Sequence, residues 1–192
     1  YMVISIGIIP QKDRGRFLSL TTAQSRPSAG QEATAISTNT PPRTNSIMIF
    51  DPDLLRRMMK TMDENGLDIL TGVYYRRTGN YSPVLYKKIE FDEQDRCTWQ
   101  ELWDVPAPDS GLFEVEGCGF GCVMTRTTVI ADVLASGEPL FTPLQGVGED
   151  LSFCFRARKL GYKIFCDSTI KCGHVGQILI NENFYEQFRG NK

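Results

Sequence analysis

Glu149 and Asp150 are the two side chains of this sequence best suited to proton-transfer chemistry, because they are adjacent acids at the predicted start of a helix. A basic, amphipathic stretch follows them and ends at Gly161, after which an apolar strand is expected. His174, the only histidine, comes shortly afterwards with Gly173 before it. A helix start and a strand end could bring these side chains to one polar cleft. Because carboxylates move protons and imidazole binds metal ions, this set favours chemistry on a charged, metal-bound substrate.

Each of these residues also has an ordinary structural explanation. Acids in a first helical turn interact favourably with the helix dipole, by about 0.3–1 kcal/mol, so Glu149 and Asp150 could simply cap the helix. A lone histidine is commonly a satisfied core or surface residue. We favour the chemical interpretation because the acids and His174 occur in one short block, and because Gly173 and Gly176 leave the backbone free to present the imidazole.

Length and composition place the chain among ordinary globular proteins. Its 192 residues can bury a core of useful size, so one domain is expected. Hydrophobic residues make up 41% and charged residues 23% of the chain. The net charge of -2 gives no indication of nucleic-acid binding. No apolar run reaches the about 20 residues that a membrane span requires, so no span is expected.

The six cysteines are expected to be free thiols. Several lie inside apolar runs, where a thiol behaves as a small hydrophobic side chain. The spacing of Cys118 and Cys122 could serve zinc, but no second pair at a similar spacing accompanies it. Reduced cysteines favour a cytoplasmic location.

Alternating strand and helix patterns predict an α/β fold with a mixed, mostly parallel sheet flanked by helices. The expected strands cover residues 2–9, 47–50, 67–75, 83–86, 112–115, 122–124, 162–166 and 169–172. The expected helices cover residues 53–65, 127–134 and 149–160, with a further polar helix from about residue 181.

The predicted domain, residues 1–192, has three parts. Residues 47–176 form a conventional core, and residues 177–192 include the C-terminal helix. Residues 1–46 are atypical, because residues 11–46 are rich in Ser, Thr, Ala, Pro, Arg and Gln and have the composition of a loop or a disordered segment.

Asp51 and Asp53 flank Pro52 at the junction between a predicted strand and a predicted helix. An Asp before or in a first helical turn, with a proline at the first helical position, is typical of a helix start. The same residues spell Asp-x-Asp at a strand end, which is the metal-binding motif of the family that the sequence resembles, as described below. We favour helix capping and keep metal ligation as the alternative.

The order of motifs resembles the GT-A fold glycosyltransferases, close to the broad inverting family 2. The matching segments are Pro52-Asp53-Leu54-Leu55, Gly117-Cys118-Gly119-Phe120-Gly121, the run from Gly148 to Arg158, Gly161-Tyr162-Lys163-Ile164, Asp167 and Gly173-His174-Val175-Gly176. Together they span about residues 47–176, and the block from Gly148 to Gly176 is the most specific part.

The resemblance implies transfer of a sugar from a nucleotide-sugar donor to a hydroxyl of a carbohydrate or another acceptor, with inversion at the anomeric carbon. By this analogy Asp150 is the general base, Glu149 binds acceptor hydroxyls, and His174 ligates Mn²⁺ or Mg²⁺, with Asp51 and Asp53 as weaker candidate ligands. A divalent cation would offset the charge of the diphosphate leaving group.

The resemblance also implies a donor and acceptor surface. Its candidate residues are Gly117, Cys118, Gly119, Trp103, Asp104 and Arg156. The glycines would let the backbone approach a sugar closely, with a plain tight hairpin as the alternative. Trp103 and Asp104 would form an acceptor subsite, although a tryptophan is more commonly a core residue. Arg156 would contact a phosphate, although facing solvent or pairing with an acid is the more common role of such an arginine.

Two other functions remain open. The shortened front of the domain and the Asp-x-Asp segment that must also start a helix suit an inactive glycosyltransferase remnant that binds a carbohydrate or a protein partner. An unrelated α/β domain, with Glu149 and Asp150 as helix caps, is the third possibility.

Overall fold

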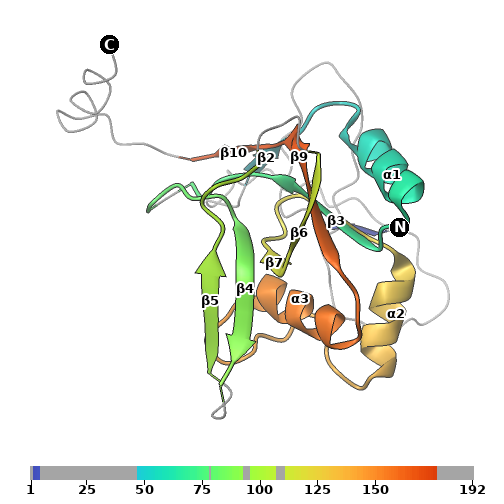
Figure 1. The fold of residues 1–192 in the computed structure, drawn as a ribbon, viewed down its shortest axis with the longest axis vertical. Helices are drawn as coiled ribbons and strands as arrows, with labels where there is room; N and C mark the ends of the chain where they lie inside the picture. The colour runs from blue at the N-terminus through green and yellow to red at the C-terminus, as the bar shows by residue number, and fades with distance from the viewer. Residues whose placement is uncertain (1, 5–46, 78, 93–95, 107–110, 177–192) are drawn as a thin grey trace, which may run out of the picture.

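The computed structural model describes residues 2–4, 47–77, 79–92, 96–106 and 111–176, which form a mixed α/β structure (Figure 1). Its helices are α1 (Leu54–Asn65), α2 (Thr127–Ala135) and α3 (Glu149–Lys159). Its strands are β1 (Met2–Ile4), β2 (Ile47–Ile49), β3 (Ile69–Val73), β4 (Leu85–Phe91), β5 (Cys97–Glu101), β6 (Leu112–Val115), β7 (Gly117–Cys118), β8 (Val123–Thr125), β9 (Ile164–Lys171) and β10 (Gly173–Val175).

The central sheet has the strand order β1-β8-β3-β9-β6. Only β3 and β9 pair in parallel among these described strands, whereas β1 with β8, β8 with β3, and β9 with β6 are antiparallel. The mixed sheet was expected, but the expectation of a mostly parallel one is wrong for this part of the chain. The physical reason is that β3 and β9 each follow a helix, while β6 and β8 follow strand and loop segments that provide no helical crossover.

Two smaller sheets flank the central one. The strands β5, β4 and β7 form one of them, and the long β4–β5 hairpin lies on the side of the molecule opposite α1 and α2 (Figure 1). The strands β10 and β2 form the other, at the upper end of the view in Figure 1. In this pair Met48 lies opposite His174. The β2–β10 pairing therefore fixes where the histidine lies.

The helices start and end near the positions that the sequence indicates. α1 buries Met58 and Met62 and ends at Gly66, whose φ of 63° is the left-handed conformation that glycine adopts readily. α3 buries Phe153, Cys154 and Ala157 among the side chains of the central sheet. Burial of a large apolar side chain such as Phe153 contributes about 1.5–3 kcal/mol. α3 is thus held firmly enough to present its first turn in a fixed position.

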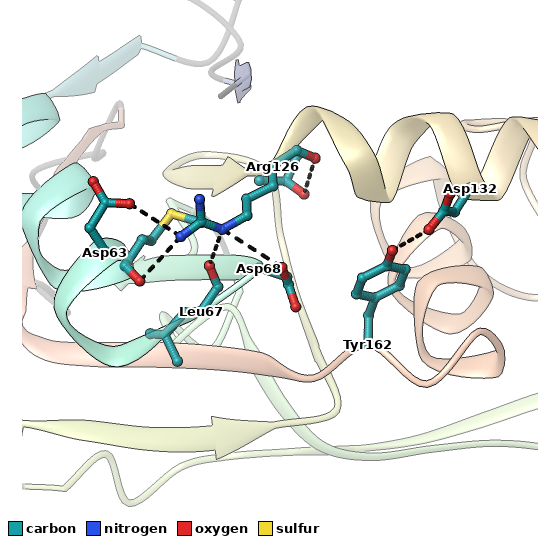
Figure 2. A network of polar contacts seen from close by, with 8 residues as sticks. Asp63, Leu67, Asp68, Arg126, Asp132 and Tyr162 are labelled. Carbon is teal, nitrogen blue, oxygen red and sulfur yellow. Dashed lines mark hydrogen bonds and ion pairs between the residues drawn. The ribbon is translucent and has the colours of Figure 1, made fainter.

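Arg126 joins the end of α1, the segment before β3 and the start of α2 (Figure 2). Its guanidinium donates a hydrogen bond of 2.9 Å to the backbone oxygen of Leu67 and forms ion pairs with Asp63, at 3.2 Å, and Asp68, at 3.7 Å. These contacts tie the end of α1 and the segment before β3 to the start of α2. Nearby, the hydroxyl of Tyr162 donates to Asp132 of α2 (Figure 2).

Some sequence expectations differ from the observed elements. The two strands expected at residues 162–166 and 169–172 form one continuous strand, β9, through the buried Asp167. The strand is not interrupted because Thr169 satisfies that carboxylate with its backbone N–H, at 2.9 Å, and its hydroxyl, at 2.6 Å. The atypical segment 11–46 and the helix expected from residue 181 lie outside the described residues. Among the described helices, none is both long and apolar enough to cross a bilayer.

Candidate functional site

The predicted acids and the predicted histidine line the same pocket. This pocket has a volume of about 210 Å³, and its walls come from five separate segments of the chain. The lining residues are Met48, Tyr74, Phe120, Gly121, Glu149, Asp150 and His174. The expectation that a helix start and a strand end converge on one cleft is therefore met by the geometry.

His174 enters the pocket from β10 with a defined orientation. Its Nδ1 atom lies 2.8 Å from the backbone oxygen of Tyr75, and because a carbonyl oxygen only accepts, Nδ1 carries the hydrogen. In the neutral imidazole, Nε2 then presents a lone pair. Nε2 is buried and has no hydrogen-bond partner among the described residues. A buried, unpartnered acceptor is costly, so this atom is suited to receive a hydrogen bond or to ligate a metal ion.

Asp150 enters the pocket from the first turn of α3. One carboxylate oxygen, Oδ1, accepts a hydrogen bond of 2.8 Å from the N–H of Leu151. Burial raises the pKa of Asp150 above the ordinary value of an aspartic acid, the Leu151 hydrogen bond limits this rise, and the adjacent charge of Glu149 adds to it. A carboxylate with a raised pKa is a stronger base than an exposed one.

The start of α3 is fixed by a hydrogen-bonded serine. Ser152 is buried, and its hydroxyl donates to the backbone oxygen of Gly148 at 2.8 Å. The same hydroxyl accepts a hydrogen bond of 2.8 Å from the N–H of Leu144. The loop before the helix is thereby attached to its first turn, which holds Glu149 and Asp150 in place.

Tyr74 is a pocket residue that the sequence reasoning did not identify. It is almost fully buried directly after β3, and its hydroxyl oxygen accepts a hydrogen bond of 3.1 Å from the N–H of Gly121. Its ring meets the His174 imidazole edge to face, with 5.8 Å between the ring centroids and an angle of 73°. Burial raises the pKa of Tyr74 well above its ordinary value, so it is a neutral phenol at any physiological pH.

The glycine-rich turn lies close to protein side chains. A Cβ atom at Gly119 would lie 2.1 Å from the Tyr74 hydroxyl oxygen, and one at Gly121 would lie 2.6–3.0 Å from atoms of the Tyr74 ring. At Gly117 it would lie 2.3 Å from Ile89. The glycines were expected to let the backbone approach a sugar, whereas the group that lies against Gly119 and Gly121 is the Tyr74 side chain. Of the residues in this turn, Phe120 and Gly121 line the pocket. Cys118, a candidate of the same turn, is fully buried away from the pocket wall.

Arg156, a candidate for phosphate contact that could instead pair with an acid, makes such a pair inside the protein. It is 4% exposed, it forms an ion pair of 3.2 Å with Glu138, and it donates a hydrogen bond of 2.9 Å to the backbone oxygen of Thr142. These contacts attach the loop after α2 to α3. The structure thus gives Arg156 a structural role, because its position on α3 faces the core and not the pocket.

The expected acceptor subsite of Trp103 and Asp104 is not part of the pocket. Both residues follow β5 and are exposed, and Trp103 retains 55% of its accessible surface. Neither lines the space around Asp150 and His174. The structure separates these two candidates from the acid pair.

Asp51 and Asp53 start α1 and do not line the pocket. Asp51 lies 3.6 Å from Arg57 and Asp53 lies 3.8 Å from Arg56, in exposed ion pairs. Asp53 occupies the N-cap position, although its side chain makes no capping hydrogen bond. The helix start was predicted correctly, and the backbone of Asp51, which accepts from the N–H of Leu54 at 3.0 Å, supplies the contact that the side chain was expected to make.

No group of three or more His, Cys, Asp or Glu side chains within the described ranges is arranged to hold a metal ion. The described pocket is lined by the carboxylates of Glu149 and Asp150 and by the imidazole of His174, whose Nε2 atom is buried and unpartnered. All six cysteines are free and buried, which confirms the expectation of reduced structural thiols.

Comparison with protein-family models gives no match for this chain, and comparison with curated proteins gives none either. The described pocket combines a basic carboxylate, an imidazole acceptor and a buried phenol, which suits the binding and deprotonation of a hydroxyl group.

Proposed function

We propose that this protein is a GT-A-like glycosyltransferase and that the pocket around Asp150 binds the acceptor hydroxyl. The observation that carries the proposal is the meeting of Glu149, Asp150 and His174, from the start of α3 and from β10, in one pocket. The order of the motif-bearing segments along the chain supports the same family, since the acid pair opens α3 and the Gly-His segment forms β10.

Asp150 would act as the general base. Its carboxylate would accept the proton of the acceptor hydroxyl while the hydroxyl oxygen attacks the anomeric carbon of the donor. The bond from that carbon to the diphosphate oxygen breaks in the same displacement, which inverts the configuration. Burial favours this role, because it raises the pKa of Asp150 and so strengthens the carboxylate as a base.

Glu149 would support the acceptor from the same helical turn. It lines the pocket but is more exposed than Asp150. Its charge adds to the rise in the pKa of Asp150, so it tunes the base as well as offering an acceptor for a second hydroxyl.

His174 would contribute one ligand to a divalent cation, Mn²⁺ or Mg²⁺. His174 lines the pocket and its buried Nε2 atom has no partner among the described residues, which supports this role. The cation, when bound, would neutralise the charge of the diphosphate leaving group.

A second candidate function is a binding module without transfer activity. It is favoured by the arrangement of Asp51 and Asp53, whose carboxylates form ion pairs with Arg57 and Arg56 at the surface. If no cation binds beside the pocket, the pocket would still bind a carbohydrate hydroxyl through Asp150 but would not hold a nucleotide sugar for reaction.

Thermal unfolding in the presence of ligands separates the two functions. The full chain is heated with each of a panel of nucleoside diphosphates and nucleotide sugars, with and without Mn²⁺. A ligand at about 100 times its dissociation constant should stabilise the folded protein by about 2.7 kcal/mol. A cation-dependent rise in melting temperature with one nucleotide supports the transferase. A well-folded protein that responds to none of them contradicts it and favours the binding module.

A further inference from the structure

Tyr74 lies between the two chemical groups of the pocket. Its hydroxyl oxygen and the Oδ2 atom of Asp150 both lie beside Gly119, at 2.1 Å and 3.3 Å from the point that a Cβ atom would occupy there. Its ring lies against the His174 imidazole. The hydroxyl of Tyr74 therefore lies on the same side of Gly119 as the Asp150 carboxylate, and its ring contacts the His174 imidazole.

The hydroxyl of Tyr74 has a hydrogen to donate. A phenol can accept hydrogen bonds and donates one. Its acceptor capacity is used by the N–H of Gly121, at 3.1 Å. Within the described part of the chain, its own hydrogen has no acceptor, and burial keeps the group protonated by raising its pKa. Because an unsatisfied buried donor is costly, a ligand that accepts this hydrogen gains binding energy.

We propose that Tyr74 and Asp150 form a donor and acceptor pair that binds a single hydroxyl group of a pyranose ligand. The hydroxyl would donate its hydrogen to Asp150 and accept the hydrogen of Tyr74. This inference rests on the proposed function and deepens it by naming the residue that orients the acceptor oxygen. Tyr74 is thus a ligand-binding residue of the reaction and also positions the imidazole of His174 through the ring contact.

The pairing explains why a hydroxyl is preferred over other groups. A carboxylate alone would equally bind an ammonium group or any other donor, and a phenol alone would bind any acceptor. Only a group that donates and accepts satisfies both residues at once. A site built to hydrogen-bond a hydroxyl rejects the analogue that lacks it, because its own polar groups are then left unpaired.

The test uses NMR of the single histidine. Because His174 is the only histidine, protein labelled with ¹⁵N-histidine gives one set of imidazole signals from the pocket wall. The full chain is titrated with the methyl pyranosides of glucose, galactose and mannose, and the dissociation constant is read from the movement of these signals. Tyr74→Phe keeps the ring and removes the hydroxyl. Tyr81→Phe is the matched control, since Tyr81 is 54% exposed and does not line the pocket.

We expect Tyr74→Phe to raise the dissociation constant for the binding pyranoside about tenfold, the usual effect of one lost hydrogen bond, and Tyr81→Phe to leave it unchanged. Equal affinity of Tyr74→Phe and the wild type, or no pyranoside response in the wild type, overturns the inference. Where Tyr74→Phe does not fold, the wild type decides: a deoxyfluoro pyranoside should bind more tightly than the deoxy one, because fluorine still accepts the Tyr74 hydrogen, and equal binding overturns the pairing.

This design keeps the two proposals apart. Pyranoside binding that depends on Tyr74, with no response to any nucleotide, supports the pairing while the transferase fails. A nucleotide response, together with equal pyranoside binding by Tyr74→Phe and the wild type, supports the transferase and contradicts the pairing of Tyr74 with Asp150.

Discussion

The Nδ1 atom of His174 lies 2.8 Å from the backbone oxygen of Tyr75, and this contact leaves the buried Nε2 atom without a hydrogen-bond partner among the described residues. A carbonyl oxygen cannot donate, so the neutral imidazole must carry its hydrogen on Nδ1. In this tautomer Nε2 carries no hydrogen and has a free lone pair. It is the form that a metal ion or a hydrogen-bond donor in the pocket requires.

The first prediction concerns this tautomer. Long-range ¹H–¹⁵N NMR of the protein without ligands should show, for the single histidine, an Nδ1 signal typical of a protonated nitrogen and an Nε2 signal typical of an unprotonated one. The measurement is made at a pH at which the imidazole is neutral. Signals of the reverse tautomer would contradict the orientation described for His174.

The second prediction concerns Asp150 and stability. Because burial raises its pKa in the folded protein, the folded state holds the Asp150 proton at pH values where the unfolded chain has already lost it. Stability is therefore lost as the pH rises from the ordinary pKa of aspartic acid to the raised one, and stays lower above it. Asp150→Asn, which cannot ionise, should be more stable than the wild type at neutral pH and equally stable at low pH.

Denaturant unfolding of Asp150→Asn and the wild type at a series of pH values checks this sign. Asp104→Asn is the matched control, because Asp104 is exposed and lies outside the pocket, and its curve should run parallel to that of the wild type. A wild type that gains stability on Asp150 ionisation would show that the carboxylate is paired and not poised as a base.

The third prediction concerns the contact between Gly119 and Tyr74. Gly119→Ala places a methyl group 2.1 Å from the Tyr74 hydroxyl oxygen and 2.6 Å from Val84, so it should destabilise the protein by about 1–3 kcal/mol through overcrowding. In the Tyr74→Phe background the hydroxyl is absent, and the penalty should be smaller. A double-mutant cycle measures this coupling.

Gly111→Ala provides the comparison for that cycle. Its φ of 68° strains an alanine, but no atom lies within 4 Å of the added methyl group. Gly111→Ala should lower the free energy of unfolding by about 1 kcal/mol, and this loss should be the same in the wild type and in the Tyr74→Phe background. Strictly additive effects of Gly119→Ala and Tyr74→Phe would contradict the contact.

Particular residues show what the sequence could and could not indicate. The start of α3, the end of α1 at Gly66 and the position of His174 after an apolar strand were predictable, because caps, glycines and hydrophobic periodicity are local signals. The partner of the glycine turn was not, since nothing local links Gly119 and Gly121 to Tyr74, which lies far away in the sequence. The closely spaced glycines indicated that some group would approach the backbone. They did not indicate that this group would be Tyr74 and not a sugar.

Arg156 illustrates a second limit. A basic residue in the last turn of α3 is expected to face solvent or a ligand, yet the helix turns it toward the core, where Glu138 and Thr142 satisfy it. Those partners lie in a loop whose path depends on tertiary packing. Asp167 of β9 behaves likewise: it lies between the two strands that the sequence predicts, and in the structure it is a buried residue whose carboxylate accepts hydrogen bonds within one continuous strand.

The fourth prediction follows from this placement of Arg156. Arg156→Ala removes a buried ion pair and a buried hydrogen bond, and because Glu138 is partly exposed the cost should be about 1–3 kcal/mol of unfolding free energy. Nucleotide affinity, measured by calorimetry on the folded variant, should not change. Arg158→Ala, which loses a more exposed pair with Glu116, is the control and should cost less. A large loss of nucleotide affinity in Arg156→Ala would contradict this placement and show that Arg156 contributes to nucleotide binding.

Sugar transfer by the wild type and by Asp150→Asn tests the proposed role of the pocket most directly. Release of nucleoside diphosphate is measured from the nucleotide sugar that stabilises the protein, with Mn²⁺ and a pyranoside acceptor, between pH 5 and pH 9. We expect the wild-type rate to rise as Asp150 loses its proton, and Asp150→Asn to be slower by a factor of about 10²–10⁴, the usual contribution of a general base. An Asp150→Asn variant that transfers sugar at the wild-type rate would contradict Asp150 as the base.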